Sequence, residues 1–237
     1  MRNKQKILIG EEMNDNTICT WNEKADCANC NINGKLVCKW DKKILTNFHL
    51  INWSAIIPTI FGMIIIGHLT NTYWILISYI VYFLFMFGFL EIRFLCSHCP
   101  YYAEDSKILH CLGNHGSFKF WKYRPGPLNE LEQFMMRFLI TTMFFIVPLS
   151  ALGFGIYHIS INYLEYGIVP LLGMIGLTAA NLVASISGLN TLKRFYCPNC
   201  VNFSCPLNEV PKNVIDKYLE KNEVMKQAWQ KSGWKLN

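Results

Sequence analysis

The residues whose type and spacing most directly predict chemistry are ten cysteines, which fall into three groups along the chain. The groups are Cys19, Cys27, Cys30 and Cys38; Cys96, Cys99 and Cys111; and Cys197, Cys200 and Cys205. Thiolates are ligands for zinc and for iron–sulfur clusters, and two cysteines in a CxxC pair reach one ion from a single turn. The pattern therefore predicts that all ten cysteines are metal ligands.

The first group has the spacing C-x7-C-x2-C-x7-C, which is symmetric about the Cys27/Cys30 pair. In such a pattern the central pair supplies two ligands and the outer cysteines complete a tetrahedron. The segment has few apolar residues, so bound metal would supply much of its folding free energy. We therefore expect residues 1–46 to form a small four-cysteine module.

A similar seven-residue stretch contains the first two cysteines of each of the other two groups. Arg93-Phe94-Leu95-Cys96-Ser97-His98-Cys99 matches Arg194-Phe195-Tyr196-Cys197-Pro198-Asn199-Cys200, and Phe48, Pro58 and His68 recur 90 residues later as Phe138, Pro148 and His158. This correspondence predicts an internal duplication. Two related helical hairpins around a two-fold axis along the membrane normal would bring the two CxxC pairs to one place.

The metal bound by these cysteines has two leading assignments. Four thiolates, or three with an imidazole, are a zinc cage, and the CPxC at Cys197 resembles half of a zinc knuckle. The cysteine–proline steps at Cys99 and Cys205 are typical of ferredoxin sequences, although the full C-x2-C-x2-C-x3-C run is absent. Ten ligands suffice for two or three clusters, which favours iron–sulfur, with zinc as the alternative.

Polar residues near the apolar segments are further candidates. His68 and His158 lie near the outer ends of two segments, where a matched pair is able to bind a haem, a metal or a quinone, or simply to face lipid headgroups. Asn181 lies in the middle of a segment and is expected to hydrogen-bond across the bundle. Four glycines are expected to allow close helix approach, namely Gly62, Gly67, Gly153 and Gly155. In the central loop, His98, His110 and His115 lie among cysteines and are possible additional ligands.

The elements that position these residues are four nearly uncharged segments. They are 50–69, 73–90, 138–158 and 167–192, each about as long as an α-helix that crosses a bilayer. Only 16% of residues are charged, and the charges are concentrated between these segments. The sequence thus predicts an all-α integral membrane protein with four transmembrane helices, arranged as two pseudo-repeated hairpins and carrying cysteine-rich cytosolic segments.

The positions of the cations predict the orientation in the membrane. All 22 Lys and Arg lie before the first span, between spans two and three, or after span four, and the other two connections carry only Glu165. The positive-inside rule then places both termini and the central loop in the cytoplasm, in a cell membrane. All ten cysteines would face the reducing cytosol, where clustered thiols indicate metal rather than disulfides. No cleavable signal peptide is visible in the first 46 residues.

This organisation divides the chain into five regions. They are a four-cysteine module (1–46), a first hairpin (47–95), a Cys/His-rich loop (96–133), a second hairpin (134–193) and a cysteine-rich tail (194–237). Asn129 with Glu130 and Glu132 is expected to cap the third span. In the tail, an amphipathic helix is expected to pack over the cysteine-rich face, because Val214, Ile215, Tyr218, Leu219, Met225 and Trp229 recur at helical spacing.

The function predicted first is a membrane-bound iron–sulfur redox protein, conceivably an oxidoreductase or a subunit of one, that passes electrons between a soluble donor and a membrane carrier or partner subunit. The alternative is a zinc-stabilised membrane enzyme or transporter acting on a lipid or small molecule. The net charge of +6 reflects topology and gives no indication of nucleic-acid binding. The four-span outline resembles that of DHHC protein acyltransferases, but their signature is absent, the nearest stretch being 108–111, so their activity is not implied.

Overall fold

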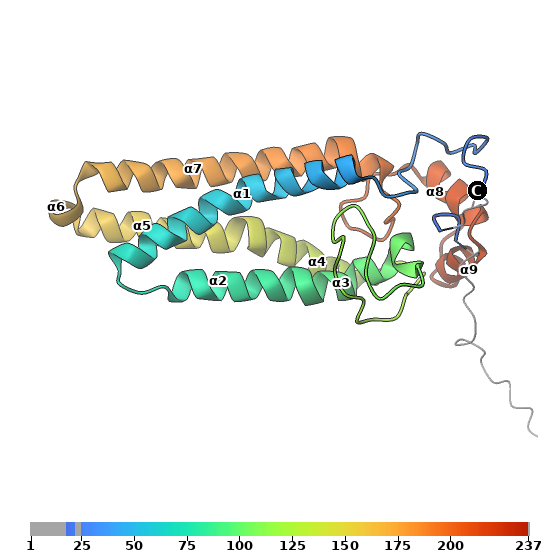
Figure 1. Ribbon diagram of the computed structural model, residues 1–237, viewed down its shortest axis with the longest axis horizontal. Coiled ribbons are helices and arrows are strands. Elements are labelled where there is room, and N and C mark those ends of the chain that lie inside the picture. Colours follow the sequence, from blue (N-terminus) through green and yellow to red (C-terminus); the bar gives the residue numbers. More distant parts are fainter. Residues whose placement is uncertain (1–17, 22–24, 237) are drawn as a thin grey trace, which may run out of the picture.

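The computed structural model describes residues 18–21 and 25–236, and residues 1–17 of the predicted four-cysteine module lie outside the described part. Every regular element in the described part is helical, apart from two isolated β-bridges. Four helices run side by side along the long axis, and a cap of loops and short helices covers one end (Figure 1). Each of the four is long and apolar enough to cross a membrane, as predicted.

The four spans are longer than the apolar segments and three of them contain more than one kind of helix. Span one is α1 (Lys42–Leu69). Span two (Trp74–His98) comprises α2 (Trp74–Phe85), the π-helix η2 (Met86–Leu90), α3 (Glu91–Phe94) and the 3-10 turn η3 (Cys96–His98). Span three (Glu130–Ile161) comprises α4 (Glu130–Thr141), the π-helix η5 (Thr142–Ile146) and α5 (Val147–Ile161). Span four (Ile168–Asn199) comprises α7 (Ile168–Thr191), the π-helix η6 (Leu192–Tyr196) and the 3-10 turn η7 (Cys197–Asn199), and α6 (Tyr163–Tyr166) joins spans three and four.

Burial divides the spans into two matching pairs. In spans one and three, 39% of the most apolar stretch is buried within the protein, against 17% in spans two and four. The first helix of each hairpin is therefore central and the second is peripheral. The large apolar surface left on the peripheral spans is what a helix facing lipid presents.

Asn181 hydrogen-bonds across the bundle, as the sequence predicts. It lies in α7 and is 1% exposed, and its amide donates to Ala55 O at 3.0 Å and Thr59 Oγ1 at 2.7 Å in α1. Because lipid offers no competing partners, such a bond between helices fixes the register of α1 against α7.

The prolines of spans one and three are accommodated differently. Pro58 lies inside the continuous helix α1, whereas Pro148 is the second residue of α5, which follows the π-helix η5. A proline lacks the N–H that an α-helix requires, and a π-helical turn is one way for the preceding residues to absorb the mismatch. The sequence match at these positions therefore does not extend to the local backbone.

Of the four glycines expected to allow close packing, three do so and one does not. A Cβ on Gly62 would lie 2.2 Å from Leu152 Cδ2, and one on Gly67 would lie 2.3 Å from Tyr73. A Cβ on Gly155 would lie 2.6 Å from Met174 Cε, because α5, α1 and α7 meet there. The expectation for Gly153 is wrong, since a Cβ there would meet open space.

The two glycines of α5 provide a matched pair for a test. Gly153→Ala should be neutral or stabilise the protein by up to about 1 kcal/mol, because alanine is the better helix former. Gly155→Ala should be destabilising by about 1–2 kcal/mol relative to Gly153→Ala, because its methyl overlaps atoms of two neighbouring helices. Thermal unfolding of both variants in one detergent would measure the difference. Equal stabilities would contradict the close contact at Gly155.

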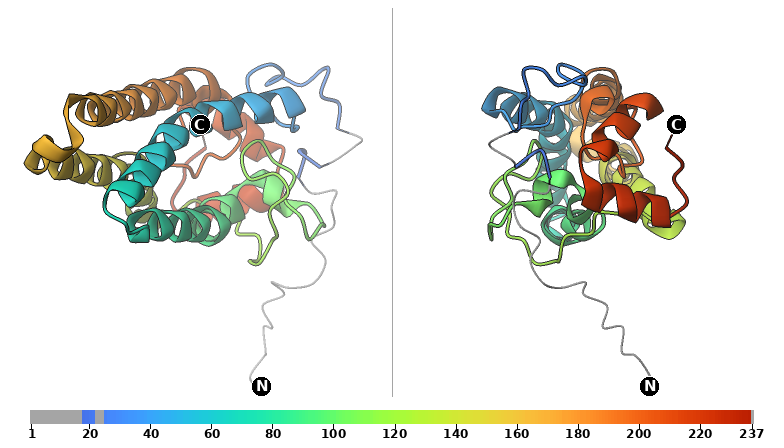
Figure 2. Two further views of the ribbon diagram at one scale, coloured as in Figure 1. Left: turned by 60° about the vertical axis from the view of Figure 1, so that its left-hand side comes forward. Right: turned by 90° about the vertical axis from the view of Figure 1, so that its right-hand side faces the viewer.

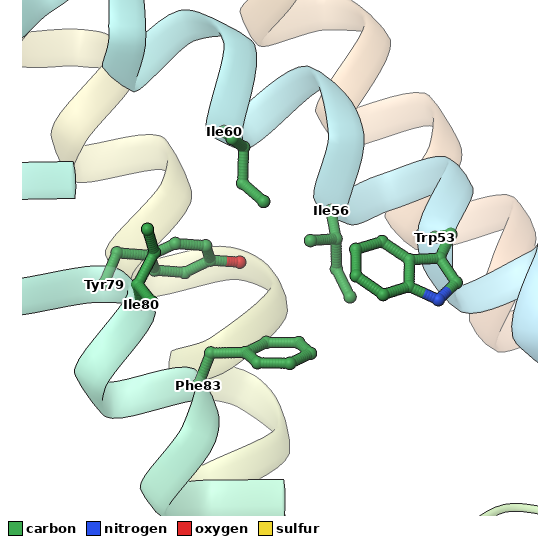
Figure 3. Close-up of a pocket in the computed structure, with 6 residues that line it drawn as sticks. All are labelled: Trp53, Ile56, Ile60, Tyr79, Ile80 and Phe83. Atoms are coloured by element: carbon green, nitrogen blue, oxygen red, sulfur yellow. The ribbon is translucent and has the colours of Figure 1, made fainter. Parts of the chain in front are cut away.

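A small apolar pocket lies between α1 and α2. Its volume is about 150 Å³, and Figure 3 shows Trp53, Ile56 and Ile60 of α1 opposite Tyr79, Ile80 and Phe83 of α2. Its lining consists of side chains that are largely apolar and partly exposed on the outside of the bundle. A lipid acyl chain fills such notches on spanning helices, and we assign it no further role.

The cap gathers three segments that are far apart in the sequence. The N-terminal segment, the central loop with the 3-10 turn η4 (Pro100–Ala103), and the tail lie beside one another at one end of the bundle (Figure 2). Ile32 and Leu36 share one hydrophobic core with Tyr101 and Trp229. The N-terminal segment therefore buries its few apolar residues against the other two segments rather than in a core of its own.

The predicted tail helix consists of two shorter helices, α8 (Lys212–Glu220) and α9 (Glu223–Lys231). All six apolar residues named from the helical spacing are buried in the core of the cap. The break falls at Asn222, which is fully buried, donates to Tyr218 O at 2.7 Å and accepts from Cys19 N at 2.7 Å. The Asn222 side-chain amide thus takes the place of the backbone N–H that a continuous helix would bring to Tyr218 O, and the Asn222 oxygen ties the break to Cys19.

Candidate metal centre

Both CxxC pairs sit on a short 3-10 turn, which follows the π-helix η6 directly at Cys197 and follows α3 at Cys96. The N–H of Cys99 donates to Cys96 O at 2.9 Å, and the N–H of Cys200 donates to Cys197 O at 3.4 Å. Each turn ends with the second cysteine in extended backbone. The two sequence motifs therefore have the same local structure where the spans enter the cap.

Six cysteines line one cavity of about 440 Å³, which we call the thiol cavity. They are Cys96, Cys99, Cys111, Cys197, Cys200 and Cys205, and we call them the cavity thiols. Cys99, from span two, lies within electrostatic range of Cys200 and Cys205 beyond span four. Cysteines that follow both hairpins thus line one cavity together with the central-loop cysteine Cys111.

Burial determines the protonation of the cavity thiols. It raises the pKa of Cys111 to about 12, and it raises the pKa values of Cys99, Cys200 and Cys205. At neutral pH these sulfurs carry protons in the metal-free protein. A metal ion must displace those protons to bind, so binding would be tighter at higher pH.

The remaining four cysteines form a second group, the N-terminal thiols, within the cap. Cys38 lies within electrostatic range of Cys19, Cys30 and Cys27, and burial raises its pKa to about 12. The Cys27/Cys30 pair sits on a turn in which the N–H of Cys30 donates to Cys27 O at 3.4 Å. Their proximity agrees with the sequence spacing, which predicts one site for these four residues.

All ten cysteines are free thiols. Within the described residues, no three His, Cys, Asp or Glu side chains are already arranged to hold a metal ion. What makes these residues suit a metal or an iron–sulfur cluster is therefore their chemistry: ten soft sulfur donors gathered in two groups. Asn114 adds to this chemistry by donating its backbone N–H to Cys111 Sγ at 3.2 Å and its side-chain amide to Cys96 Sγ at 3.2 Å. Such hydrogen bonds favour the thiolate form that a metal requires.

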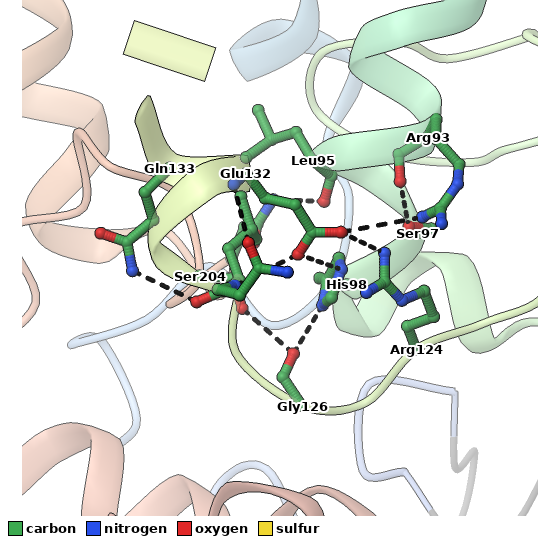
Figure 4. Close-up of polar contacts among 12 residues, drawn as sticks. Arg93, Leu95, Ser97, His98, Arg124, Gly126, Glu132, Gln133 and Ser204 are labelled. Atoms are coloured by element: carbon green, nitrogen blue, oxygen red, sulfur yellow. Dashed lines mark hydrogen bonds and ion pairs between the residues drawn. The ribbon is translucent and has the colours of Figure 1, made fainter. Parts of the chain in front are cut away.

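A buried polar network holds the first CxxC motif against the central loop (Figure 4). His98 lies between the two cysteines and donates from Nδ1 to Gly126 O at 2.6 Å. Its Nε2 lies 3.9 Å from Glu132 Oε2, and Arg124 Nη1 lies 2.6 Å from Glu132 Oε1. The Glu132 carboxylate also accepts from the N–H of Asn129 at 3.1 Å in a capping box that confirms the predicted start of span three.

The other histidines have separate environments. His110 Nδ1 lies 2.6 Å from Glu104 Oε2, and the His115 ring packs against Trp40 at 4.6 Å between centroids. His68 is exposed, while His158 is half-buried and contacts Phe154 and Tyr166. The predicted role of His68 and His158 in binding a cofactor remains a prediction.

Sequence reasoning missed Glu91. This residue begins α3, lines the thiol cavity and has one carboxylate oxygen, Oε2, that is buried without a hydrogen-bond partner in the described part of the chain. It lies within electrostatic range of Cys96, Cys111 and Cys205. In the sequence, a carboxylate at the end of an apolar segment and two residues before Arg93 is typical of an ordinary interfacial charge. Only the position of Glu91 in the cavity wall indicates a role in the site.

The fold and the site define a helical protein with four candidate membrane spans and a cysteine-lined cavity where those spans enter a cap. Comparison with protein-family models, with curated proteins and with solved structures gives no match. The case for a function therefore rests on the geometry of the chain itself.

Proposed function

We propose that this chain is a membrane-bound iron–sulfur protein that transfers electrons between a soluble donor and a membrane carrier or partner subunit. The observation that carries the proposal is the convergence of six cysteines from both hairpins on one cavity. Bound there, an iron–sulfur cluster would supply one-electron redox chemistry. Cys99, Cys200 and Cys205 are the central ligands of this proposal, with Cys96, Cys111 and Cys197 around them.

The space at the site favours a cluster over a single ion. A structural zinc site is closed, with four ligands in direct contact with the metal. The cavity thiols instead border about 440 Å³ of free volume, which suits a bulky group. Zinc remains the alternative, and it suits the N-terminal thiols, whose four cysteines match the ligand number of a structural zinc site. In that case the metal would be structural and the protein an enzyme or transporter of a lipid or small molecule.

The orientation and the duplication belong to the same proposal. Both termini and the cap lie on the cytoplasmic side, where thiols stay reduced and a soluble donor is available. The equal burial of spans one and three, the equal burial of spans two and four, and the matching 3-10 turns at the two CxxC pairs support two hairpins derived from one ancestor. The different backbone at Pro58 and Pro148 marks where the halves have diverged.

Metal and sulfide analysis of the full-length protein tests the proposal. Protein purified without oxygen from iron-sufficient cells should be brown, contain iron and acid-labile sulfide, and lose its visible absorption on reduction with dithionite. Zinc content measured on the same sample is the control for the alternative. Colourless protein that contains zinc but neither iron nor sulfide would overturn the redox function.

A further inference from the structure

The thiol cavity extends well beyond the sulfur atoms and reaches between the spans. Every span contributes to its wall: Ala55 from span one, Phe87 from span two, Phe144 from span three, and Ser185 and Gly188 from span four. Most of this part of the wall is apolar. The volume, about 440 Å³, falls within the range of pockets that enclose small organic ligands.

The wall of the cavity coincides with the irregular parts of the spans. All three π-helices contribute to it, through Met86 and Phe87 of η2, Phe144 of η5, and Leu192 of η6. A π-helical turn weakens a helix and is retained most often where it shapes a functional site. Within the described residues, each of these three turns contributes side chains to the wall of the same cavity.

Two buried hydrogen-bond acceptors on this wall lack partners. Glu91 Oε2 and Asn202 Oδ1 are each buried without a hydrogen bond within the described residues. Asn202 is only 7% exposed, and its side-chain N–H donates to Leu95 O at 3.2 Å. Its side-chain oxygen therefore remains available to accept a hydrogen bond from a ligand. A buried acceptor without a donor is costly, so a ligand that brings donors to this wall gains affinity.

We propose that the thiol cavity binds a bilayer-soluble molecule whose polar end donates hydrogen bonds to Glu91 and Asn202 and whose apolar body lies between the four spans. Quinols and long-chain alcohol lipids share this chemistry. We assign the quinol class, and that choice rests on the proposed redox function: the cluster would occupy the end of the cavity that the cavity thiols line, and the quinol would lie beside it in the part between the spans. The binding site itself follows from the cavity and its two acceptors.

The acceptor character of the wall predicts which redox form is bound. A quinol carries two hydroxyl donors, whereas the corresponding quinone carries only acceptors. The quinol should therefore bind about three- to tenfold more tightly than the quinone, as expected for one additional hydrogen bond. Glu91→Gln should remove most of this preference, because an amide offers both a donor and an acceptor.

The test uses full-length protein in nanodiscs under anaerobic conditions, with a short-chain menaquinol, the matching menaquinone and a short-chain diacylglycerol as probes. Binding is followed by tryptophan fluorescence. Ala184→Phe, which places a ring at the cavity wall, should abolish binding, and the exposed Glu130→Gln is the matched control that should bind as the unaltered protein does. Melting temperatures establish that each variant is folded.

The outcomes separate this inference from the proposed function. Tighter binding of the quinol that depends on Glu91 supports the inference, whatever metal the same sample contains. Diacylglycerol binding more tightly than the quinol, with the same dependence on Glu91, would overturn the quinol assignment. Failure of all probes to bind, or binding that neither Glu91→Gln nor Ala184→Phe changes, would overturn the cavity as a ligand site.

Discussion

Glu132→Gln is expected to destabilise the protein by about 2–4 kcal/mol, the largest effect of any single substitution outside the cysteines. The Glu132 side chain is 8% exposed and pairs with Arg124 at 2.6 Å and with Arg93 at 4.0 Å. Glutamine keeps the shape but leaves two guanidinium groups without a counter-charge. The two arginines are about one third exposed, so water offsets part of the loss.

The control for this substitution is Glu130→Gln. Glu130 is exposed, lies in the same first turn of α4 and carries the same charge, so its replacement should change stability by less than about 0.5 kcal/mol. Denaturant unfolding in mild detergent, followed by circular dichroism, measures both variants. A Glu132→Gln variant as stable as Glu130→Gln would show that the network of Figure 4 contributes little to stability.

Loss of a single cysteine should remove metal from one group of thiols and leave the other group loaded. Cys200→Ser is expected to abolish the iron and sulfide bound by the cavity thiols, because Cys200 lies within electrostatic range of Cys99 and Cys205. Cys27→Ser, at an exposed member of the N-terminal thiols, should leave that cluster intact. The two variants thus serve as each other's control.

Metal content per chain and the visible spectrum of both variants provide the measurement. The expected effect is large, because metal bound by four thiolates contributes about 10 kcal/mol or more to the stability of its site. If Cys27→Ser and Cys200→Ser each removed all of the metal, the ten cysteines would form a single coupled site. If neither changed the metal content, the grouping proposed for these residues would be wrong.

The spans were predictable because their signal is local. A run of about 20 apolar residues suffices to predict each span. A lone asparagine within such a run predicts the Asn181 bond, and an Asn-x-x-Glu pattern at a helix start predicts the cap on α4. The predicted helix ends were less accurate, because π-helical and 3-10 turns extend spans two and four into the cysteine motifs. Those turns depend on packing around the cavity, and a hydropathy pattern does not predict where they occur.

The cysteines that line the cavity could be predicted from the sequence, but the residues around them could not. The CxxC spacing and the repeated stretch identified the cysteines and predicted that two pairs would meet. Glu91, Asn114 and Asn202 came to light only in the fold, because each is an unremarkable polar residue until a distant segment packs against it. The break at Asn222 was missed for the same reason, since its partner is Cys19 near the other end of the chain.

The contacts that close the cap have a consequence for how the protein is made. Thr20 bonds to Tyr218 at 2.8 Å across 198 positions of sequence, and Trp21 Nε1 donates to Pro100 O at 3.1 Å. A ribosome releases Tyr218 only after all four spans have left it, so the N-terminal segment must wait for its partner through nearly the whole of synthesis. The thiols of the N-terminal segment stay uncovered by the tail during that interval, and delivery of any metal to them is expected to follow chain completion rather than accompany it.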